Sequence, residues 1–432
     1  MSELVNPNRL LSLDVFRGIT IAGMTLVNNP GSWEHIYWPL EHAEWNGLTP
    51  TDWVFPFFLF IVGVAISIAL GKRIEEGVTR STYTKIFSRF VLIYLLGLAT
   101  SVVPFFSYAK TDAPEWLKMG IWLVFAASIL FLLLRNFKIG LPLAALGFVG
   151  IAVMYLGGYT VVLYHFETVR IFGVLQRIAI CYLIASLIFL HTTWKQQLGI
   201  GIVLLLVYWI VMTTIPVPGC EITTMNDKAC NVAAYLDRLI ITVPHIWSQG
   251  KVYDPEGILS TIPAIVTCLS GVLTGTWLKS DRDQYQKVSG IFFFGIILFA
   301  LSWIWNASFP INKSLWTSSY VLATSGLALF MLGCCYWLID IKGYKKWATP
   351  FMIFGANALA LFVFSAFFSR MLGALKVTGS DGQPISIGEW AYYFFLSFLE
   401  PINASLAFAV SFILVWLFLM WLLYRKRIYI RV

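Results

Sequence analysis

A histidine and an aspartate ten residues apart are the side chains of this sequence with the clearest chemical use. His42 stands in the segment HAEWNGLT, and Asp52 follows in TPTDWVFP. A carboxylate that orients an imidazole turns the ring into a general base, and imidazole titrates close to neutral pH. Asp52 also stands where an acid caps the start of a helix, which is a structural use of the same residue. The pair predicts either base catalysis or a helix cap.

Four polar side chains recur along the apolar segment that precedes this pair, namely Asp14, Arg17, Thr25 and Asn28. Their spacing places them on one stripe of a helix, about 21 Å long at 1.5 Å per residue. Ionisable groups inside a bilayer are costly, so each is a candidate functional residue. The stripe predicts a polar lining. The alternative for Asp14 and Arg17 is a simple ion pair one helical turn apart.

Further polar groups occur at membrane depth in Arg89 and in the pair Gln176 and Arg177. Guanidinium groups bind phosphates through forked donors, and they also pair with carboxylates such as Asp14. The sequence has no phosphate-binding glycine loop, no dinucleotide motif, no metal-spaced histidine or cysteine cluster and no nucleophile elbow. We therefore predict no metal site.

The elements that must position these residues are membrane helices. Of the 432 residues, 59% are hydrophobic and only 12% are charged, whereas soluble domains are about half apolar and a quarter charged. Apolar stretches of roughly 20 residues, enough to cross a bilayer, recur along the whole chain. We predict an all-α, polytopic membrane bundle that forms a single domain over 1–432. About twelve transmembrane helices are expected near 12–29, 52–71, 84–107, 116–134, 139–156, 170–190, 196–214, 258–278, 287–305, 316–339, 348–373 and 403–424.

The charge distribution predicts the orientation of these spans. With the N-terminus in the cytoplasm, 18 of the 30 Lys and Arg residues fall in cytoplasmic segments. The opposite loops hold about seven basic residues and some fourteen of the 22 acids. Basic residues concentrate on the cytoplasmic side of membrane proteins, so both termini are expected there. The net charge of +8 thus indicates a lipid bilayer as the partner and argues against nucleic acid.

Three exoplasmic loops are expected near 30–51, 215–257 and 374–402. The second loop contains Cys220 and Cys230. If that loop faces an oxidising compartment, the two cysteines are predicted to form a disulfide. The other four cysteines fall within spans and are expected to be buried hydrophobic side chains.

The residues around these polar groups resemble a known family. The segments RLLSLDVFRGITIAGMTLVNN and EHAEWNGLTPTDWVFPFFLFIVGVAISIAL are similar to the core of the heparan-α-glucosaminide N-acetyltransferase family, including its bacterial NagX-type relatives in the transmembrane acyltransferase superfamily. Further matching blocks occur in the same order along most of the chain: GVLQRIAICY, YDPEGILSTIPAI, FPINKSLWTSSYVL and FGANALALFVFS.

The resemblance implies an acetyl-CoA-dependent N-acetyltransferase. Lysosomal members move acetyl from cytosolic acetyl-CoA across the membrane to the amine of a terminal glucosamine. The active histidine of the family matches His42, and motif positions match Asn28 and Asp52. We expect His42 to act as base or acetyl carrier, Asp52 to orient it, and Asn28 to bind the developing oxyanion. The residues expected at the acetyl-CoA site are Asp14, Arg17, Arg89, Gln176 and Arg177.

The sequence also departs from the family. The luminal N-terminal domain of the lysosomal members has no counterpart, and the helical hairpin over 116–156 resembles nothing in them. A bacterial inner membrane is therefore the expected setting. The acceptor, expected to be an amino sugar or a glucosamine-terminated oligosaccharide, is left open, as is homodimerisation. The alternative functions are an amino-sugar or oligosaccharide transporter without acyl transfer and a structural or assembly subunit.

Overall fold

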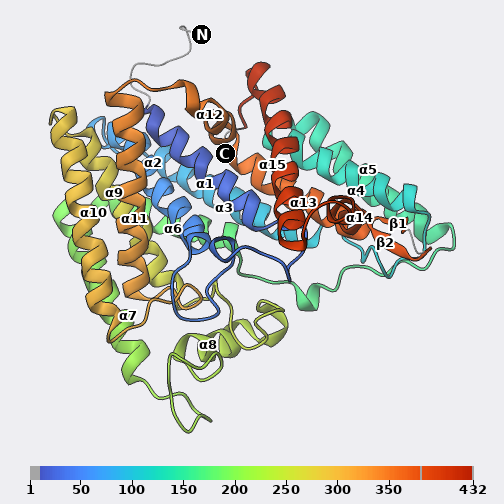
Figure 1. Cartoon of the computed structure of the whole chain (residues 1–432), viewed down its shortest axis with the longest axis horizontal. Helices are drawn as coiled ribbons and strands as arrows, with labels where there is room; N and C mark the ends of the chain where they lie inside the picture. Colours follow the sequence, from blue (N-terminus) through green and yellow to red (C-terminus); the bar gives the residue numbers. More distant parts are fainter. Residues whose placement is uncertain (1–9, 380–381, 431–432) are drawn as a thin grey trace. The chain divides into compact units, whose positions relative to one another are not determined.

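The computed structural model describes residues 10–379 and 382–430, and it is almost entirely helical (Figure 1). Ten helices within this part of the chain are long and apolar enough to cross a membrane. Each has 18 or more residues, which is close to the length that hydrocarbon thickness demands. They are α2 (Val54–Glu75, entered through the 3-10 turn η2, Pro50–Trp53), α3 (Arg80–Val102), α4 (Glu115–Leu133), α5 (Phe137–Leu156), α6 (Val174–His191), α7 (Trp194–Thr214), α9 (Thr261–Lys279), α10 (Gln284–Asn306), α11 (Ser318–Cys335, continued by a π-helical turn, Tyr336–Ile341) and α15 (Pro401–Arg425).

The predicted continuous span over 348–373 is wrong in one respect, because it is two helices. Helices α12 (Thr349–Ala356) and α13 (Ala358–Ala374) meet at a bend of 72°. The buried side chain of Asn357, at the bend, donates to the carbonyl of Ile428 at 3.0 Å and accepts from the amide of Ile430 at 2.7 Å. Contacts with the end of the chain thus stabilise the break. Counted as one span, the pair is an eleventh.

The all-α polytopic prediction is confirmed, whereas the count of twelve stays a prediction. The first predicted span is α1 (Leu11–Val27), whose 17 residues make it shorter than any of the ten. The predicted cytoplasmic position of both termini also stays a prediction, and residues 1–9 and 431–432 lie outside the described part of the chain.

Two predicted loops contain more regular structure than expected. The loop 374–402, apart from residues 380–381, which are outside the described chain, forms an antiparallel hairpin of β1 (Lys376–Thr378) and β2 (Pro384–Ser386). Helix α14 (Ile387–Leu396) follows, and a capping box between Ser386 and Glu389 starts it. The loop 215–257 contains α8 (Val232–Leu236), a π-helical turn (Asp237–Ile241) and a three-residue 3-10 helix (Val243–His245).

The described chain forms two compact units. Unit 1 comprises Met1–Thr20, His42–Gly97 and Arg170–Met352, and unit 2 comprises Ile21–Glu41, Leu98–Val169 and Ile353–Val432. The single domain over 1–432 therefore stays a prediction.

Unit 1 is built on the close approach of α2 and α9. A Cβ on Gly63 would lie 1.9 Å from the carbonyl oxygen of Cys268, and one on Gly271 would lie 2.0 Å from that of Phe60. Helices in membranes pack through such small residues, since van der Waals contact replaces the hydrophobic driving force. Leu59, Val64 and Val272 are buried around this seam. The seam holds α2 against α9, and polar residues described below lie near the N-terminal ends of these two helices.

Unit 2 contains the predicted helical hairpin over 116–156. It is formed by α4 and α5, which turn at Arg135, a residue with φ 58°. Ser128 of α4 donates to the carbonyl of Gly140 of α5 at 2.8 Å. The same unit holds the segment Ile21–Glu41, where the Tyr37 hydroxyl donates to Asn403 of α15 at 2.7 Å.

Candidate active site

The structure brings His42 and Asp52 together at the start of α2. The distance from Nδ1 of His42 to Oδ1 of Asp52 is 2.7 Å. The aspartate side chain is 1% exposed, whereas the histidine side chain is 48% exposed. An ionised carboxylate at Nδ1 fixes the proton on that nitrogen and leaves the lone pair on Nε2. The arrangement therefore has the geometry of an oriented base open to the outside.

The second carboxylate oxygen of Asp52 holds the chain that leads into α2. Its Oδ2 accepts from the amide of Ala43 at 3.2 Å and from the amide and hydroxyl of Thr49, each at 3.0 Å. The last two contacts form a capping box over η2. The backbone carbonyl of Asp52 accepts from the Tyr320 hydroxyl of α11 at 2.7 Å. Asp52 thus makes both sets of contacts that the sequence left as alternatives.

Lys313 is a member of this site that was missed in the sequence. Its Nζ lies 2.9 Å from Nδ1 and 3.0 Å from Nε2 of His42, and 3.6 Å from Oδ1 of Asp52. Burial lowers the pKa of Lys313, although the negative charges of Asp52 and Glu256 oppose that shift. The only sequence signal was a lysine in one of the matching blocks, FPINKSLW, on the side of the membrane predicted to be poor in basic residues.

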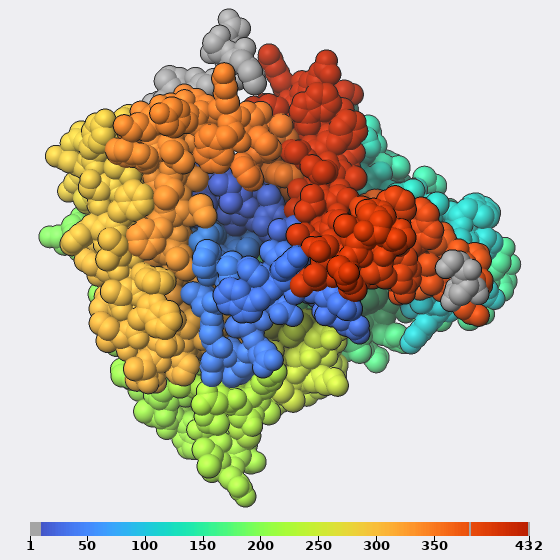
Figure 2. Space-filling model, in the orientation of Figure 1, coloured from blue at the N-terminus to red at the C-terminus, as the bar shows by residue number. Residues whose placement is uncertain are grey.

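The loop that carries Lys313 is joined to the segment that carries His42. The side-chain amide of Asn312 donates to Oδ1 of Asn46 at 3.1 Å, and the amide of Gly47 donates to the carbonyl of Ile311 at 2.8 Å. Oδ1 of Asn312 also accepts from the amide of Leu315 at 2.8 Å. These bonds explain how two segments far apart in sequence bring the side chains of Lys313 and His42 into contact. Figure 2 shows blue atoms of the N-terminal part of the chain at the surface, and within that part His42 and Asn46 are exposed.

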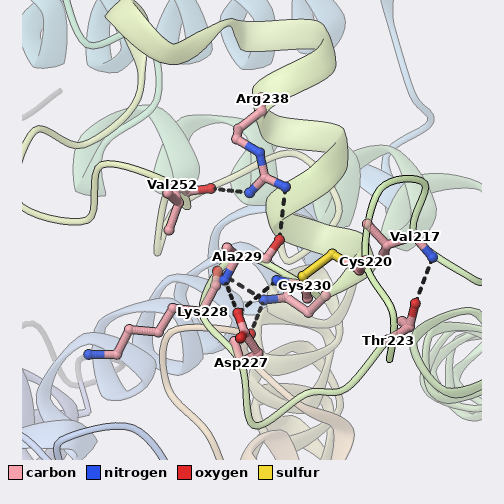
Figure 3. The surroundings of a disulfide bond; sticks show 10 residues. Val217, Cys220, Thr223, Asp227, Lys228, Ala229, Cys230, Arg238 and Val252 are labelled. Atoms are coloured by element: carbon pink, nitrogen blue, oxygen red, sulfur yellow. Dashed lines mark hydrogen bonds between the residues drawn. A yellow bond between two sulfur atoms is a disulfide. The ribbon is translucent and has the colours of Figure 1, made fainter.

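A disulfide-bonded loop also contacts the segment that carries His42. Cys220 and Cys230 are bonded, with Cα atoms 5.9 Å apart, which confirms the predicted disulfide (Figure 3). Oδ1 of Asp227 accepts from the amides of Ala229 and Cys230 and so closes the turn. The loop in turn accepts from Trp45 Nε1 at the carbonyl of Met225 and from Asn46 Nδ2 at the side chain of Asn226, both at 2.7 Å. These two hydrogen bonds hold Trp45 and Asn46, which follow His42 by three and four residues.

Arg170, Asp254 and Glu256 form an ionic cluster in unit 1. Arg170 donates to Asp254 at 2.9 and 2.5 Å and pairs with Glu256. Burial raises the pKa of Asp237 to about 6, despite the amide that Ile258 donates to it. Burial also favours the protonated form of Glu256, but the positive charges of Arg170, Arg177 and Lys313 outweigh it and lower the pKa of that carboxyl. Glu256 therefore carries a negative charge that reaches Lys313.

Arg177 belongs to this cluster and is not exposed. Its side chain is 0% exposed and lies with Cζ 5.1 Å from the centre of the Trp316 ring. Nη2 donates to the carbonyl of Gly257 at 3.1 Å and to the Ser260 hydroxyl. Nε and Nη1 have no hydrogen-bond partner among the described residues. In this structure Arg177 holds the turn at Gly257–Ser260, and it does not present a donor to solvent.

The other residues predicted for acetyl-CoA lie in different surroundings. Arg17 pairs with Asp14 on α1 at 3.5 Å, with 29% of its side chain exposed. Arg89 of α3 is exposed and lies 4.9 Å from the centre of the Tyr182 ring. Gln176 is buried, and its Oε1 lies 2.5 Å from where a Cβ on Gly97 would stand. The described contacts of these residues are thus with Asp14, Tyr182 and Gly97 respectively.

Asn28 lies directly after the end of α1, is exposed, and belongs to unit 2. Its neighbour Asn29 is buried and donates to the carbonyl of Thr25 at 2.8 Å. The Thr25 hydroxyl in turn donates to the carbonyl of Ile21 at 2.8 Å. The polar side chains at this end of α1 are thus used, at least in part, to satisfy backbone groups of the helix.

Comparison with known proteins agrees with the resemblance noted in the sequence. Residues 9–238, more than half of the chain, match the family model described as "Domain of unknown function (DUF5009)". Two curated relatives named heparan-alpha-glucosaminide N-acetyltransferase are 28% identical: the protein of Mus musculus over 407 residues and that of Homo sapiens over 408. The alignments cover 82% and 83% of this chain but 53% and 52% of the relatives, so the chain spans about half their length. The chain belongs to the DUF5009 family and is a relative of the heparan-α-glucosaminide N-acetyltransferases.

Proposed function

We propose that this protein is a transmembrane acetyltransferase. It would move an acetyl group from acetyl-CoA on the cytoplasmic side to the amine of a glucosamine-type sugar on the exoplasmic side of a bacterial inner membrane. One observation carries the proposal: a half-exposed imidazole whose Nδ1 is held at 2.7 Å by a buried carboxylate. The names of the mouse and human relatives support the choice of acyl transfer over other reactions of a base.

The chemistry assigned to the site requires one proton acceptor and one oxyanion donor. His42 takes a proton from the acceptor nitrogen as that nitrogen bonds to the acetyl carbon, and Asp52 stabilises the imidazolium that forms. The carbon–sulfur bond then breaks, and coenzyme A leaves as a thiol once the proton is returned to sulfur. We assign to Asn28 the hydrogen bond to the oxyanion, a role typically worth about 3 kcal/mol.

The phosphates of the donor nucleotide require cationic side chains that donate forked hydrogen bonds. The partly exposed guanidinium of Arg17 and the exposed guanidinium of Arg89 are suited to its phosphates by donor geometry. We assign phosphate binding to these two residues. Arg177, which is fully buried and engaged with Gly257 and Ser260, is assigned a positioning role instead.

A direct test uses purified protein with labelled acetyl-CoA and glucosamine. We expect an N-acetylated product that disappears in His42→Ala, while the neighbouring variant His35→Ala retains activity and both variants keep the melting temperature of the wild type. Labelled acetyl trapped on the protein without acceptor, and released by glucosamine, would assign His42 as acetyl carrier; its absence under single-turnover conditions would assign direct transfer. Wild-type turnover that survives in His42→Ala would sink the proposal.

A transporter is the second candidate, and the bend between α12 and α13 is the observation that favours it. Broken spans of this kind recur at the substrate sites of secondary transporters. A transporter would move an amino sugar into sealed vesicles without acetyl-CoA, and His42→Ala would leave that uptake unchanged. Uptake that requires acetyl-CoA and yields acetylated sugar would decide for the enzyme.

A further inference from the structure

Within residues 10–379 and 382–430, Lys313 is the cation that contacts the proposed base. It reaches His42 from a loop between α10 and α11, and the two residues are 271 positions apart in the sequence. The hydrogen bonds from Asn312 to Asn46 and from Gly47 to Ile311 fasten that loop to the histidine segment. The contact is therefore built by the fold, and the lysine stem is mostly enclosed, with 23% of the side chain exposed.

The position of Nζ shows that the lysine is not a simple hydrogen-bond partner of the ring. It lies at 2.9 and 3.0 Å from the two ring nitrogens. One atom at nearly equal distance from both nitrogens cannot lie along both in-plane lone pairs, and Nδ1 already faces Asp52 at 2.7 Å. The interaction between Lys313 and His42 is thus one of charge, and it leaves Nε2 able to accept a proton.

The charges around the ring oppose one another. Asp52 and Lys313 face His42, and Lys313 is itself faced by His42, Asp52 and Glu256. A carboxylate in contact with an imidazole favours the imidazolium, whereas an ammonium in contact disfavours it. The ammonium of Lys313 therefore opposes the effect of the Asp52 carboxylate at the ring.

We propose that Lys313 is a positioning residue that keeps His42 in its neutral, proton-accepting form by holding a positive charge against the ring, and so sets the lower pH limit at which the site works. The link to turnover rests on the proposed function; the effect on the ring itself does not. This role fits the chemistry, because the acceptor amine can be deprotonated only by a base that is not already protonated.

The test titrates His42 without relying on acetyl transfer. Diethyl pyrocarbonate acylates neutral but not protonated imidazole, and mass spectrometry of peptides resolves the modification of His42 from that of the other four histidines. We expect the pH of half-maximal modification at His42 to rise by roughly one unit in Lys313→Gln, since loss of a contacting like charge favours protonation. Lys313→Arg should keep the wild-type profile, and His35 is the internal control in every sample.

Two chemical adducts of one cysteine variant provide the control for misfolding of Lys313→Gln. Lys313→Cys, made in a Cys334→Ser background to remove an exposed free thiol, is treated with either aminoethyl or hydroxyethyl methanethiosulfonate. The protein is the same, and only the adduct differs in charge. We expect the aminoethyl adduct alone to restore the wild-type profile. Coinciding profiles for the two adducts, or a downward shift in Lys313→Gln, would overturn the inference.

Turnover separates this inference from the proposed function. If the wild type acetylates glucosamine, the acid limb of kcat/KM in Lys313→Gln should move upward by the same amount as the modification profile. A modification profile that shifts in a protein without transferase activity would refute the proposed function and leave the role of Lys313 intact. Transferase activity whose acid limb is the same in Lys313→Gln and wild type would refute the role of Lys313 alone.

Discussion

The two oxygens of Asp52 have different partners, and this division explains how one buried carboxylate organises the site. Oδ1 orients His42, while Oδ2 collects Ala43 and Thr49 at the turn before α2. Both sets of contacts favour the ionised form, because every partner is a donor. The carboxylate also lies at a helix start, where the peptide dipoles favour negative charge.

Replacing that carboxylate by an amide should separate the two roles of Asp52, which are to orient His42 and to cap the turn before α2. In Asp52→Asn the amide oxygen can still cap the turn, but the amide nitrogen faces Nδ1 and favours the tautomer with the proton on Nε2. We expect kcat/KM to fall by roughly 10³- to 10⁴-fold, with a melting temperature close to that of the wild type. Glu44→Gln removes an exposed acid two residues from His42 and serves as the matched control. Equal activity of the two variants would contradict the role of Asp52.

Arg177 allows a test of stability against ligand binding. Arg177→Met removes the donors to Gly257 and Ser260 and a positive charge that favours the ionised form of Glu256. Breaking a buried ionic network by removing one partner typically costs about 3–5 kcal/mol. We expect a large drop in melting temperature and, in the protein that remains folded, an unchanged KM for acetyl-CoA.

The control for that experiment is Arg17→Met, at a partly exposed ion pair on α1. There we expect the reverse pattern, a raised KM for acetyl-CoA with little change in melting temperature, because exposed pairs contribute little to stability. If Arg177→Met were stable and raised KM, Arg177 would be a phosphate ligand after all.

At this scale the sequence predicted what residue type and spacing can encode. His42 and Asp52 are ten residues apart and flank a predicted helix start, so their contact was foreseeable. Lys313 is 271 residues from His42, and no spacing rule connects positions at that separation. Arg177 was assigned to phosphates on its chemistry alone, since its enclosure depends on Gly257, Ser260 and Trp316, which lie far along the chain.

Among the elements, α2 and α9 depend on glycine most directly. Their backbones meet at Gly63, where a Cβ would overlap the carbonyl of Cys268. Gly63→Leu should force the helices apart, cost about 3 kcal/mol or more by overpacking, and abolish monodisperse protein in size-exclusion chromatography. Gly199→Leu is the matched control, because a Cβ at that position of α7 meets nothing within 4 Å. Recovery of folded Gly63→Leu at wild-type yield would contradict the described seam.

The disulfide-bonded loop is the element whose loss should affect activity more than global folding. In Cys220→Ser with Cys230→Ser, the turn that accepts from Trp45 and Asn46 loses its covalent closure, which is typically worth about 2–4 kcal/mol. We expect acetyl transfer to fall by roughly ten- to a hundredfold through misplacement of His42. Cys334→Ser, at an exposed free thiol, should retain activity. An unaffected double variant would show that the loop does not position HAEWNGLT.

Hydropathy predicted most helix limits to within a few residues, because the length of an apolar run is a local property. The bend at Asn357 was not predictable in this way. Its side chain is satisfied by Ile428 and Ile430, about seventy residues further along the chain, and the segment FGANALALFVFS is apolar on both sides of it. The hairpin of β1 and β2 was missed for a different reason, because strands of only three residues each are too short to show an alternating pattern.

At the scale of the whole molecule, the chain alternates between its two units. It passes from one to the other near residues 20, 41, 97, 169 and 352. The proposed base, its carboxylate and Lys313 all lie in unit 1, as do Asp14, Arg17 and Arg89, whereas Asn28 lies in unit 2. The contacts among His42, Asp52 and Lys313 are thus contained within unit 1.

The predicted orientation of the spans is testable in intact cells. In a Cys334→Ser background, we introduce Glu44→Cys near His42 and, separately, Lys342→Cys in a basic loop; both positions are exposed. We expect a membrane-impermeant maleimide to label Glu44→Cys in whole cells and Lys342→Cys only after permeabilisation, as the distribution of basic residues predicts. The opposite pattern would reverse the topology and exclude donor binding at Arg17 from the cytoplasm.

The clamp on Asn357 has a consequence for biogenesis. The ribosome adds Ile428 and Ile430 about seventy residues after Asn357, so the amide of Asn357 is made well before its partners exist. An unmatched amide in hydrocarbon is costly. The bent segment therefore gains its stabilising contacts only after residues 428–430 have been made, and a nascent chain that stops short of them leaves the bend between α12 and α13 unsecured.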